Sequence, residues 1–212
     1  MKVPGQRVET AEAAAPPKGA AARTRALMVA TASAMMRRGL SPSVSEVAEV
    51  AGVSRSTAYR YFPTRGDMLR AVVAEALGPI LDRPAIGGDA GARLEALYRA
   101  TYPRLFEHEA TFRAALRQSM EPDETGPQDG SLGRGHRRKL LAAAVEGLGL
   151  PPEAQNRLVM ALSLTFGTEA MVVLKDIWGL DLDAAQEVAL EAARAILAAA
   201  QQRALSNESP PG

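Results

Sequence analysis

The segment from Ser43 to Met68, SVSEVAEVAGVSRSTAYRYFPTRGDM, constrains the fold more than any other part of the chain. Ser43 and Glu46 form the S-x-x-E pattern of a capping box, which satisfies the free backbone amides at the start of a helix. Gly52 can adopt the positive φ that ends such a helix, and Ser54 is suited to cap the next one. The segment therefore predicts two short helices joined by a tight turn, which is the arrangement of a helix-turn-helix.

The second of these helices, over roughly Arg55 to Tyr61, concentrates side chains that form hydrogen bonds with nucleic acid. Arginine can pair with the O6 and N7 atoms of guanine, and serine or threonine can contact either kind of base edge. Hydroxyl groups also bind phosphate oxygens. A solvated polar face without a ligand is the alternative, but it accounts poorly for Tyr59 and Tyr61 beside arginines. The pattern thus favours a helix that enters the major groove, with Ala58 and Phe62 facing the core.

The segment resembles the N-terminal DNA-binding domain of the TetR family of bacterial transcriptional regulators. The resemblance extends from Arg23 to Glu75 and rests on residues at fixed spacing: Val44, Glu46, Val47, Ala48, Ala51, Gly52, Val53, Ser54, Thr57, Tyr59 and Phe62. It implies base or phosphate contacts from Arg55, Ser56, Thr57, Tyr59 and Tyr61. Arg65 occupies the place of a lysine that often binds phosphate in the family. Ser43 and Ser45, at the start of the first helix, complete the expected DNA-binding set.

Composition and charge agree with a helical protein that contacts DNA through its first third. Of the 212 residues, 47% are apolar and only 4% are aromatic, which suits packed helices better than sheets. Residues 1–70 contain 11 Lys and Arg against 5 Asp and Glu, whereas the rest of the chain contains 14 against 19. Because phosphates attract the basic part and repel the acidic part, the expected DNA-binding part is the N-terminal one.

Several other functional classes lack support in the sequence. The chain has no cysteine, so disulfides and thiolate metal sites are excluded. It has neither a G-x-S-x-G elbow nor a glycine-rich phosphate loop, and we expect no catalytic residue, metal or cofactor. His108 lies between two glutamates that point in other directions on a helix, and His136 lies in the basic run RGHRRK, which we expect to face solvent. No segment resembles a signal peptide or a membrane span, so a cytoplasmic protein is expected.

The expected fold class is all-α, with an N-terminal three-helix helix-turn-helix domain followed by a larger helical ligand-binding and dimerisation domain. The expected boundaries are a disordered arm over 1–20, the DNA-binding domain over 21–78, the second domain over 79–205 and a disordered tail over 206–212. Outside the motif, we expect helices at about Ala21–Arg38, Arg65–Leu77, Ala92–Phe106, Glu109–Met120, His136–Leu148, Pro151–Gly179 and Asp181–Gln202. Gly78-Pro79 is expected to stop the second of these, and Leu81–Gly91 and Glu121–Gly135 are expected to be a linker and a mobile loop.

Two of the expected helices have apolar faces that require partners. The first should bury Leu27, Ala30, Ala34 and Met35, and the last carries Ala185, Val188, Ala192, Ala195, Ile196 and Ala199 along one side. The two long C-terminal helices form a plausible dimer surface, and the family resemblance implies a four-helix bundle between two subunits. Packing within one subunit is the alternative. Dimers are favoured because one short recognition helix buries too little surface to specify a DNA sequence.

The family resemblance also implies a small regulatory molecule held between the DNA-binding domain and the dimer surface. The expected ligand-binding residues are Tyr98, Tyr102, Phe106, Phe112, Arg117, Met120 and Phe166, with Leu116, Met160 and Met171 as further candidates for an apolar wall. Arg113 and Glu169 could orient a polar end of such a ligand, or could brace helices. The same aromatic and methionine spacing also suits an ordinary core.

These observations predict a homodimeric repressor that binds a palindromic operator and is released by a small apolar or amphipathic effector. The alternative is a regulator or activator that needs no effector and whose helical body recruits a protein partner.

Overall fold

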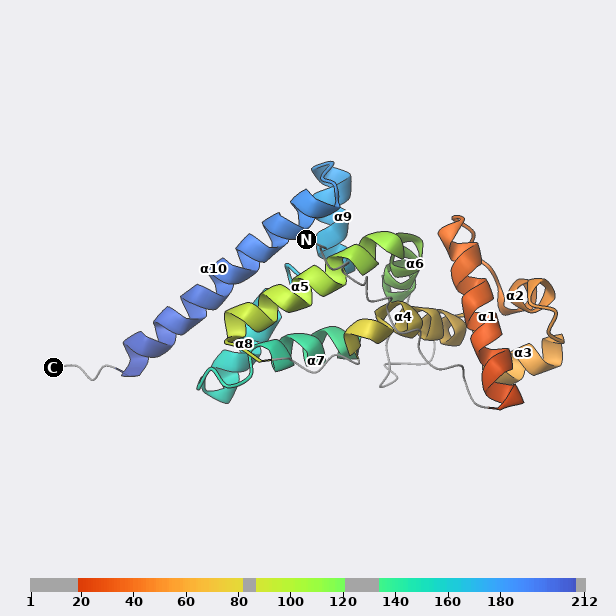
Figure 1. Ribbon diagram of the computed structural model, residues 1–212, viewed down its shortest axis with the longest axis horizontal. Coiled ribbons are helices and arrows are strands. Elements are labelled where there is room, and N and C mark those ends of the chain that lie inside the picture. The colour runs from red at the N-terminus through yellow and green to blue at the C-terminus, as the bar shows by residue number, and fades with distance from the viewer. Residues whose placement is uncertain (1–18, 82–86, 121–133, 209–212) are drawn as a thin grey trace, which may run out of the picture.

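The computed structural model describes residues 19–81, 87–120 and 134–208, and every regular element in these ranges is a helix (Figure 1). The expected all-α fold class is confirmed. The greater part of the expected N-terminal arm, the centre of the Leu81–Gly91 linker, nearly all of the Glu121–Gly135 loop and the end of the C-terminal tail lie outside the described residues. None of the described helices combines the length and the hydropathy that a bilayer-spanning segment needs.

The N-terminal part consists of α1 (Ala20–Arg37), α2 (Val44–Val50), α3 (Arg55–Tyr61) and the start of α4 (Arg65–Leu81). Both caps predicted for the motif are present. Glu46 N–H donates to Ser43 Oγ at 3.2 Å and Ser43 N–H donates to Glu46 Oε2 at 2.7 Å, which completes the capping box. The Ser54 side chain accepts from the Thr57 N–H at 3.3 Å. Gly52 has φ +66° in the turn, as its role as a helix-ending residue requires.

The buried face of α1 is displaced from the predicted one. Leu27 is 49% exposed and Ala30 is also exposed, whereas Met28, Ala32 and Met36 are buried. Leu27 and Met28 are both apolar, so helical periodicity alone gives two possible faces one residue apart. The packing of α1 against α4 and α6 selects the face that contains Met28.

The body begins with α4, which does not stop at Gly78-Pro79 as predicted but continues to Leu81. Arg104 donates from its guanidinium to the backbone oxygen of Ala76, so α5 satisfies a carbonyl near the end of α4. The next helix, α5 (Ala90–Glu107), starts at the Asp89 cap and contains Pro103 in its interior. It is followed by α6 (Glu109–Met120), which has the predicted bounds.

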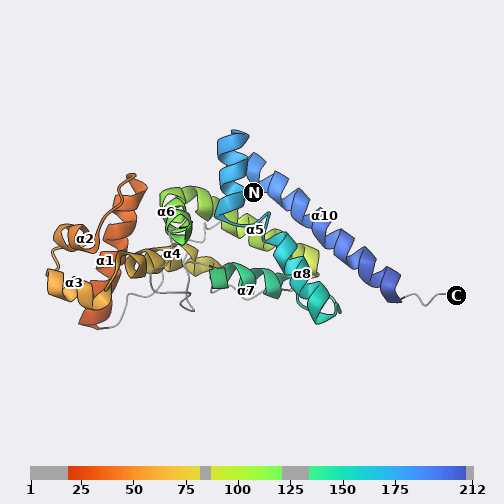
Figure 2. The same ribbon diagram turned by 180° about the vertical axis from the view of Figure 1, so that it is seen from behind.

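The C-terminal half contains α7 (Arg134–Ala144), α8 (Pro152–Leu162), α9 (Thr168–Val172), the π-helical turn η1 (Val173–Ile177) and α10 (Leu182–Glu208). The prediction of a single helix over Pro151–Gly179 is wrong, because the helix ends at Leu162 and a new one begins at Thr168. Gly167 has φ +108° at the N-cap of α9, a conformation that favours glycine and interrupts a helix. Figure 2 shows α10 lying along the body, where it packs against α5 and α8.

Buried apolar side chains of the described residues form two clusters. The first joins α1 to α4 with residues of the body, including Leu105 of α5, Phe112 of α6 and Met171 of α9. The second is built from α5, α7, α8 and α10, with Tyr98 and Tyr102 at its centre. The N-terminal part therefore shares its core with α6, and α10 closes the opposite end of the molecule (Figure 1).

Candidate DNA-binding surface and effector cavity

The α3 helix presents one apolar and one polar face. Ala58 and Phe62 are buried in the first cluster, which confirms that they face the core, and α3 packs against α2. On the other side, the predicted DNA-binding side chains Arg55, Ser56 and Tyr59 are exposed, and Thr57 and Tyr61 are half-buried at the edges. The expected hydrogen-bonding groups therefore remain accessible to a ligand outside the protein. In Figure 1, α3 lies at the far end of the molecule from α10, so the body does not obstruct this face.

The two serines of the predicted DNA-binding set have protein partners. Ser43 is half-buried and its hydroxyl oxygen caps α2, so this group already has a structural role. Ser45 Oγ lies 3.2 Å from Tyr59 Oη, which connects the first helix of the motif to the second. This contact gives the Tyr59 hydroxyl a partner on α2.

Arg65 begins α4 directly beside the motif. Its guanidinium donates to Ser41 Oγ and is otherwise exposed, so it projects from the same end of the molecule as α3. The start of α4 is held by Thr64 and Asp67: Thr64 Oγ1 donates to Asp67 Oδ2 at 2.6 Å. This bond is the largest cause of the lowered pKa of the Asp67 carboxyl, to which the pair with Arg70 also contributes.

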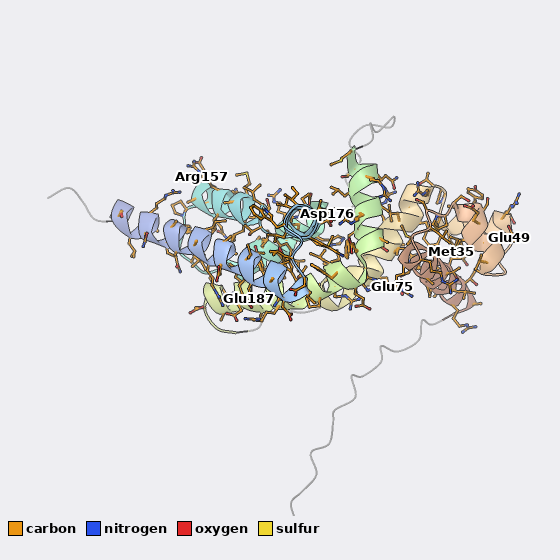
Figure 3. The ribbon with its side chains drawn as sticks, turned by 90° about the horizontal axis from the view of Figure 1, so that it is seen from above. Met35, Glu49, Glu75, Arg157, Asp176 and Glu187 are labelled. Carbon is orange, nitrogen blue, oxygen red and sulfur yellow. The ribbon has the colours of Figure 1, made fainter. Side chains whose placement is uncertain are left out.

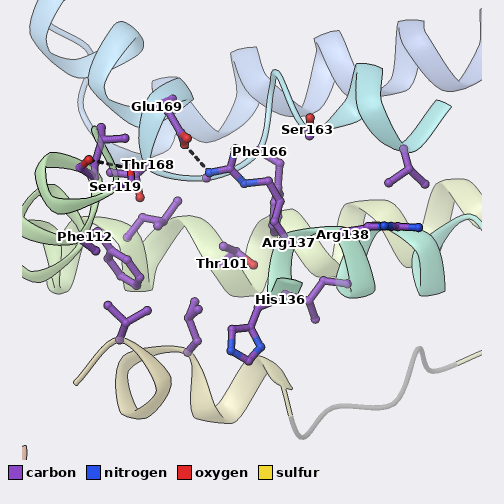
Figure 4. A pocket seen from close by; sticks show the side chains of 18 of the residues that line it. Thr101, Phe112, Ser119, His136, Arg137, Arg138, Ser163, Phe166, Thr168 and Glu169 are labelled. Carbon is purple, nitrogen blue, oxygen red and sulfur yellow. Dashed lines mark hydrogen bonds and ion pairs between the residues drawn. The ribbon is translucent and has the colours of Figure 1, made fainter. Parts of the chain in front are cut away.

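A cavity of about 540 Å³ lies in the body between α4 and α8. It is lined by Val73, Leu77, Thr101, Leu105, Phe112, Ala115, Leu116, Ser119, His136, Arg137, Arg138, Leu140, Asn156, Val159, Met160, Ser163, Phe166, Gly167, Thr168 and Glu169. The lining is mostly apolar, with basic side chains of α7 on one side (Figure 4). A volume of this size falls within the range of about 300–1,000 Å³ found for small-molecule sites.

Comparison with known proteins identifies the N-terminal part. The fold is similar to the crystal structure of a tetR-family transcriptional regulator from Streptomyces coelicolor, with a TM-score of 0.59 and 21% sequence identity over 89% of this chain and 91% of that chain. At that identity the likeness establishes the fold alone. No curated protein sequence matches the chain. Residues 27–72, however, match the model of the bacterial regulatory proteins of the tetR family. Residues 27–72 are therefore a TetR-family domain.

A chain with this domain is a DNA-binding transcription regulator that contains a helix-turn-helix. Proteins of this family are generally not enzymes. Among the described residues, no three His, Asp or Glu side chains gather closely enough to hold a metal ion.

The cavity includes only part of the predicted ligand-binding set. Phe112 and Phe166 line it, and so do the further candidates Leu116, Met160 and Glu169. Phe106 instead lies beside Lys175, whose Nζ is 5.2 Å from the ring centroid. Arg117 is exposed and Met120 is 73% exposed, and neither borders the cavity. Helical periodicity could not distinguish the two sides of α6 because both carry large side chains.

Tyr98 and Tyr102 are core residues outside the cavity lining. Tyr98 Oη lies 2.7 Å from Thr165 Oγ1, and Tyr102 Oη donates to the Thr165 backbone oxygen at 3.0 Å. Both side chains are fully buried. Burial raises the pKa of Tyr98 to about 12 and raises that of Tyr102 further. These hydroxyls hold the segment between α8 and α9 in place.

Arg113 is likewise occupied by protein partners. It donates to Asp176 Oδ2 at 2.8 Å through Nη1 and to Glu109 Oε1 at 2.8 Å through Nε. Lys175 also donates to Glu109, so these charges join α6 to η1. The Asp176 and Glu109 bonds raise the pKa of the Arg113 guanidinium. Of the two roles considered for Arg113, the structure supports the bracing of helices.

Sequence analysis missed the polar side of the cavity. The basic run of α7 was expected to face solvent, but His136 and Arg137 are half-buried and line the cavity together with Arg138. Because Leu140 follows the basic residues closely, the sequence of this helix is compatible either with exposure to solvent or with a place on a cavity wall. The position of α7 against α5 and α8 decides between them.

Proposed function

We propose that this chain is a homodimeric repressor that occupies a two-fold symmetric operator in the cytoplasm and leaves it when a small molecule fills the cavity. The observation that carries the proposal is the position of α4. Val73 and Leu77 of this helix line the cavity, and Arg65 at its start lies beside the recognition helix α3. A ligand that moves α4 therefore changes the position of the DNA-binding surface.

Dimer geometry makes DNA affinity sensitive to such a movement. Two recognition helices must reach half-sites separated by about 34–36 Å, so a small displacement of each α4 prevents simultaneous binding. Energetically, the effector shifts the protein toward the released state by its differential affinity for the two states.

The exposed apolar side chains of the C-terminal half support a dimer. Leu164 is 79% exposed, Ile177 is 72% exposed and Trp178 is 71% exposed, and Val188 of α10 is also exposed. If these side chains form one contiguous patch in the folded chain, they indicate a protein interface. The buried side of α10, in contrast, packs within the subunit through Ala185, Ala189, Leu190, Ala193 and Leu197. The predicted stripe on α10 is therefore divided: Ala185 packs internally, whereas Val188 and Ala195 are exposed.

Genomic footprinting of the full chain tests this proposal. We expect protected sites with two-fold symmetric halves about one helical turn apart, each bound by an even number of chains. Binding to the recovered fragment should weaken steeply as salt concentration rises, because phosphate contacts release counterions. Protected sites without symmetry, bound by a single chain, would contradict the dimeric repressor. DNA affinity that no ligand of the cavity changes would support the regulator that needs no effector.

A further inference from the structure

We infer that the effector is an amphipathic molecule with one anionic group, held by Arg137, and an apolar body that fills the rest of the cavity. This inference rests on the proposed function, because it names the chemical class of the ligand that would release the operator.

The charge of the cavity wall is the first argument. Arg137 and Arg138 supply two positive charges, and His136 stands beside them. Of the described residues that line the cavity, Glu169 alone carries a carboxylate, and it is paired with Arg137. A cationic ligand would therefore face two guanidinium groups without a free counter-charge, and burial of an unpaired charge is costly. An anion, in contrast, adds the charge that the wall lacks.

The Arg137 guanidinium lies between Gly167 and Glu169 (Figure 4). It lies against the backbone of Gly167, where a Cβ would be only 2.7 Å from Arg137 Nη2. Glu169 accepts from Nη2, yet a guanidinium carries five N–H donors arranged to hold a carboxylate by two bonds. The Glu169 side chain is 52% exposed, against 29% for Arg137. Glu169 can consequently turn into solvent when a ligand anion takes its place, while Arg137 stays at the cavity wall.

A buried hydroxyl on the wall of the same cavity lacks a hydrogen-bond partner. Thr101 of α5 is 1% exposed, and its Oγ1 makes no hydrogen bond. Figure 4 shows Thr101 between Arg137 and Phe112, on the wall of the cavity. Because buried polar groups almost always have a partner, an oxygen of the ligand near Thr101 would satisfy the hydroxyl. A hydroxyl can donate to an anion, which agrees with the charge of Arg137.

Other parts of the cavity wall suit an apolar body. Val73 and Leu77 of α4, Leu105 of α5 and Phe112 of α6 provide aliphatic and aromatic surface there. With the anion at Arg137, the body of the ligand extends toward α4. The ligand therefore contacts both the charged anchor on α7 and the helix that leads to the DNA-binding surface.

Three probes with the same alkyl chain test the inference: decanoate, decanol and decylammonium, each titrated calorimetrically into the full chain below its micelle concentration. We expect decanoate to bind at least about tenfold more tightly than the other two, since a charge-assisted hydrogen bond distinguishes it. Arg137→Gln should reduce decanoate affinity to that of decanol and leave decanol affinity unchanged. Glu169→Gln is the matched control and should preserve or strengthen decanoate binding.

Equal or tighter binding of decanol or decylammonium would overturn the inference, and so would the absence of decanoate binding at millimolar concentration. Arg138→Gln serves as a second variant if Arg137→Gln melts at a lower temperature, and a decanoate preference unchanged in both variants would also overturn it. Operator retention, measured in the same samples, reports separately on the proposed function. Decanoate that binds without releasing DNA supports the ligand class but contradicts the effector-released repressor. DNA release by decanol but not by decanoate would support the effector-released repressor and contradict the anionic ligand class.

Discussion

The backbone of Gly66, in the first turn of α4, lies against the side-chain amide of Gln118 on α6. A Cβ at position 66 would be 2.5 Å from Gln118 Nε2, closer than real Cβ contacts. A side chain at position 66 would therefore require the flexible Gln118 amide to turn aside at the start of α4, one residue from Arg65. Because α6 also lines the cavity through Phe112 and Leu116, this contact joins the body to the DNA-binding surface.

Gly66→Ala should change the free energy of unfolding by less than about 1 kcal/mol, because the helix propensity that alanine adds offsets the cost of turning the Gln118 amide aside. The double variant with Gln118→Ala should be at least as stable as the wild type, since it removes the clash together with Gln118 Oε1, which is buried without a partner. Urea unfolding of the four proteins of this double-mutant cycle measures the coupling. Additive effects of the two substitutions would show that the contact has no energetic consequence.

Arg55→Ala should reduce affinity for the operator by about 1–3 kcal/mol and relax the base preference at one position, if Arg55 pairs with guanine. Arg55 is exposed on α3, so its loss should leave the melting temperature nearly unchanged. Competition binding with operator variants measures the preference. Equal losses on operator and random DNA would assign Arg55 to phosphate contact instead.

Arg65→Ala should weaken binding to all DNA sequences alike and reduce the slope of log affinity against log salt by about one, because it removes one phosphate contact. Arg157→Ala is the matched control with the same change of charge. Arg157 lies on α8, at the opposite end of the molecule from Glu49 of the DNA-binding part (Figure 3). A similar salt slope for wild type and Arg65→Ala would exclude the phosphate contact.

Leu164→Glu should dissociate the proposed dimer, since it places a charge among the exposed apolar side chains of the C-terminal half. Multi-angle light scattering gives the mass of each protein. Trp178, the single tryptophan of the chain, provides a second signal because its fluorescence should move to longer wavelength as the interface opens. Leu40→Glu, at an exposed leucine beside α1, is the control and should remain dimeric.

Tyr98 should make stability depend on alkaline pH. Burial raises its pKa to about 12 in the folded chain, whereas the unfolded chain ionises near pH 10. The unfolded state therefore loses the proton first. The contribution of Tyr98 is fully present below pH 10 and declines as pH rises toward 12, by about 2–3 kcal/mol in total.

The comparison for this prediction is Tyr98→Phe. At neutral pH this variant should be less stable by about 1 kcal/mol, because it lacks the bond to Thr165. Between pH 10 and 12 its disadvantage should shrink, since phenylalanine cannot ionise. Urea unfolding at several pH values measures both differences, and a disadvantage that stays constant above pH 10 would contradict the raised pKa.

The elements that short-range chemistry determines could be predicted from the sequence. The Ser43–Glu46 capping box and the Ser54 cap act within one helical turn, so α2 and α3 are found where their patterns indicate. The bounds of α6 were also predicted correctly. Two predictions were wrong: α4 does not end at Gly78-Pro79, and no continuous helix runs through Gly167. The end of α4 is supported by Arg104, which lies far along the sequence, and a glycine in an apolar segment does not reveal its φ.

The candidate sites show the same division. The exposed face of α3 follows from the alternation of Ala58 and Phe62 with polar neighbours. The cavity was predicted only in part because its wall comes from separate helices, and the side that α7 presents depends on its packing. Phe112 and Phe166 were identified, but Tyr98 has the same apolar spacing and belongs to the core. Sequence periodicity indicates that a side chain is buried, whereas only the tertiary arrangement shows whether it borders a cavity.

The first hydrophobic cluster has a consequence for protein engineering. Since Leu105, Phe112 and Met171 complete the core beneath α1 and α4, the helix-turn-helix is not an interchangeable module. A chimera that transfers this DNA specificity to another regulator must carry α6 along with the first four helices, or supply a helix of matching shape. A graft cut at the end of α4 would expose apolar residues of α1 and α4 to solvent. We expect such a graft to stop binding its operator because it unfolds, with no change in its base contacts.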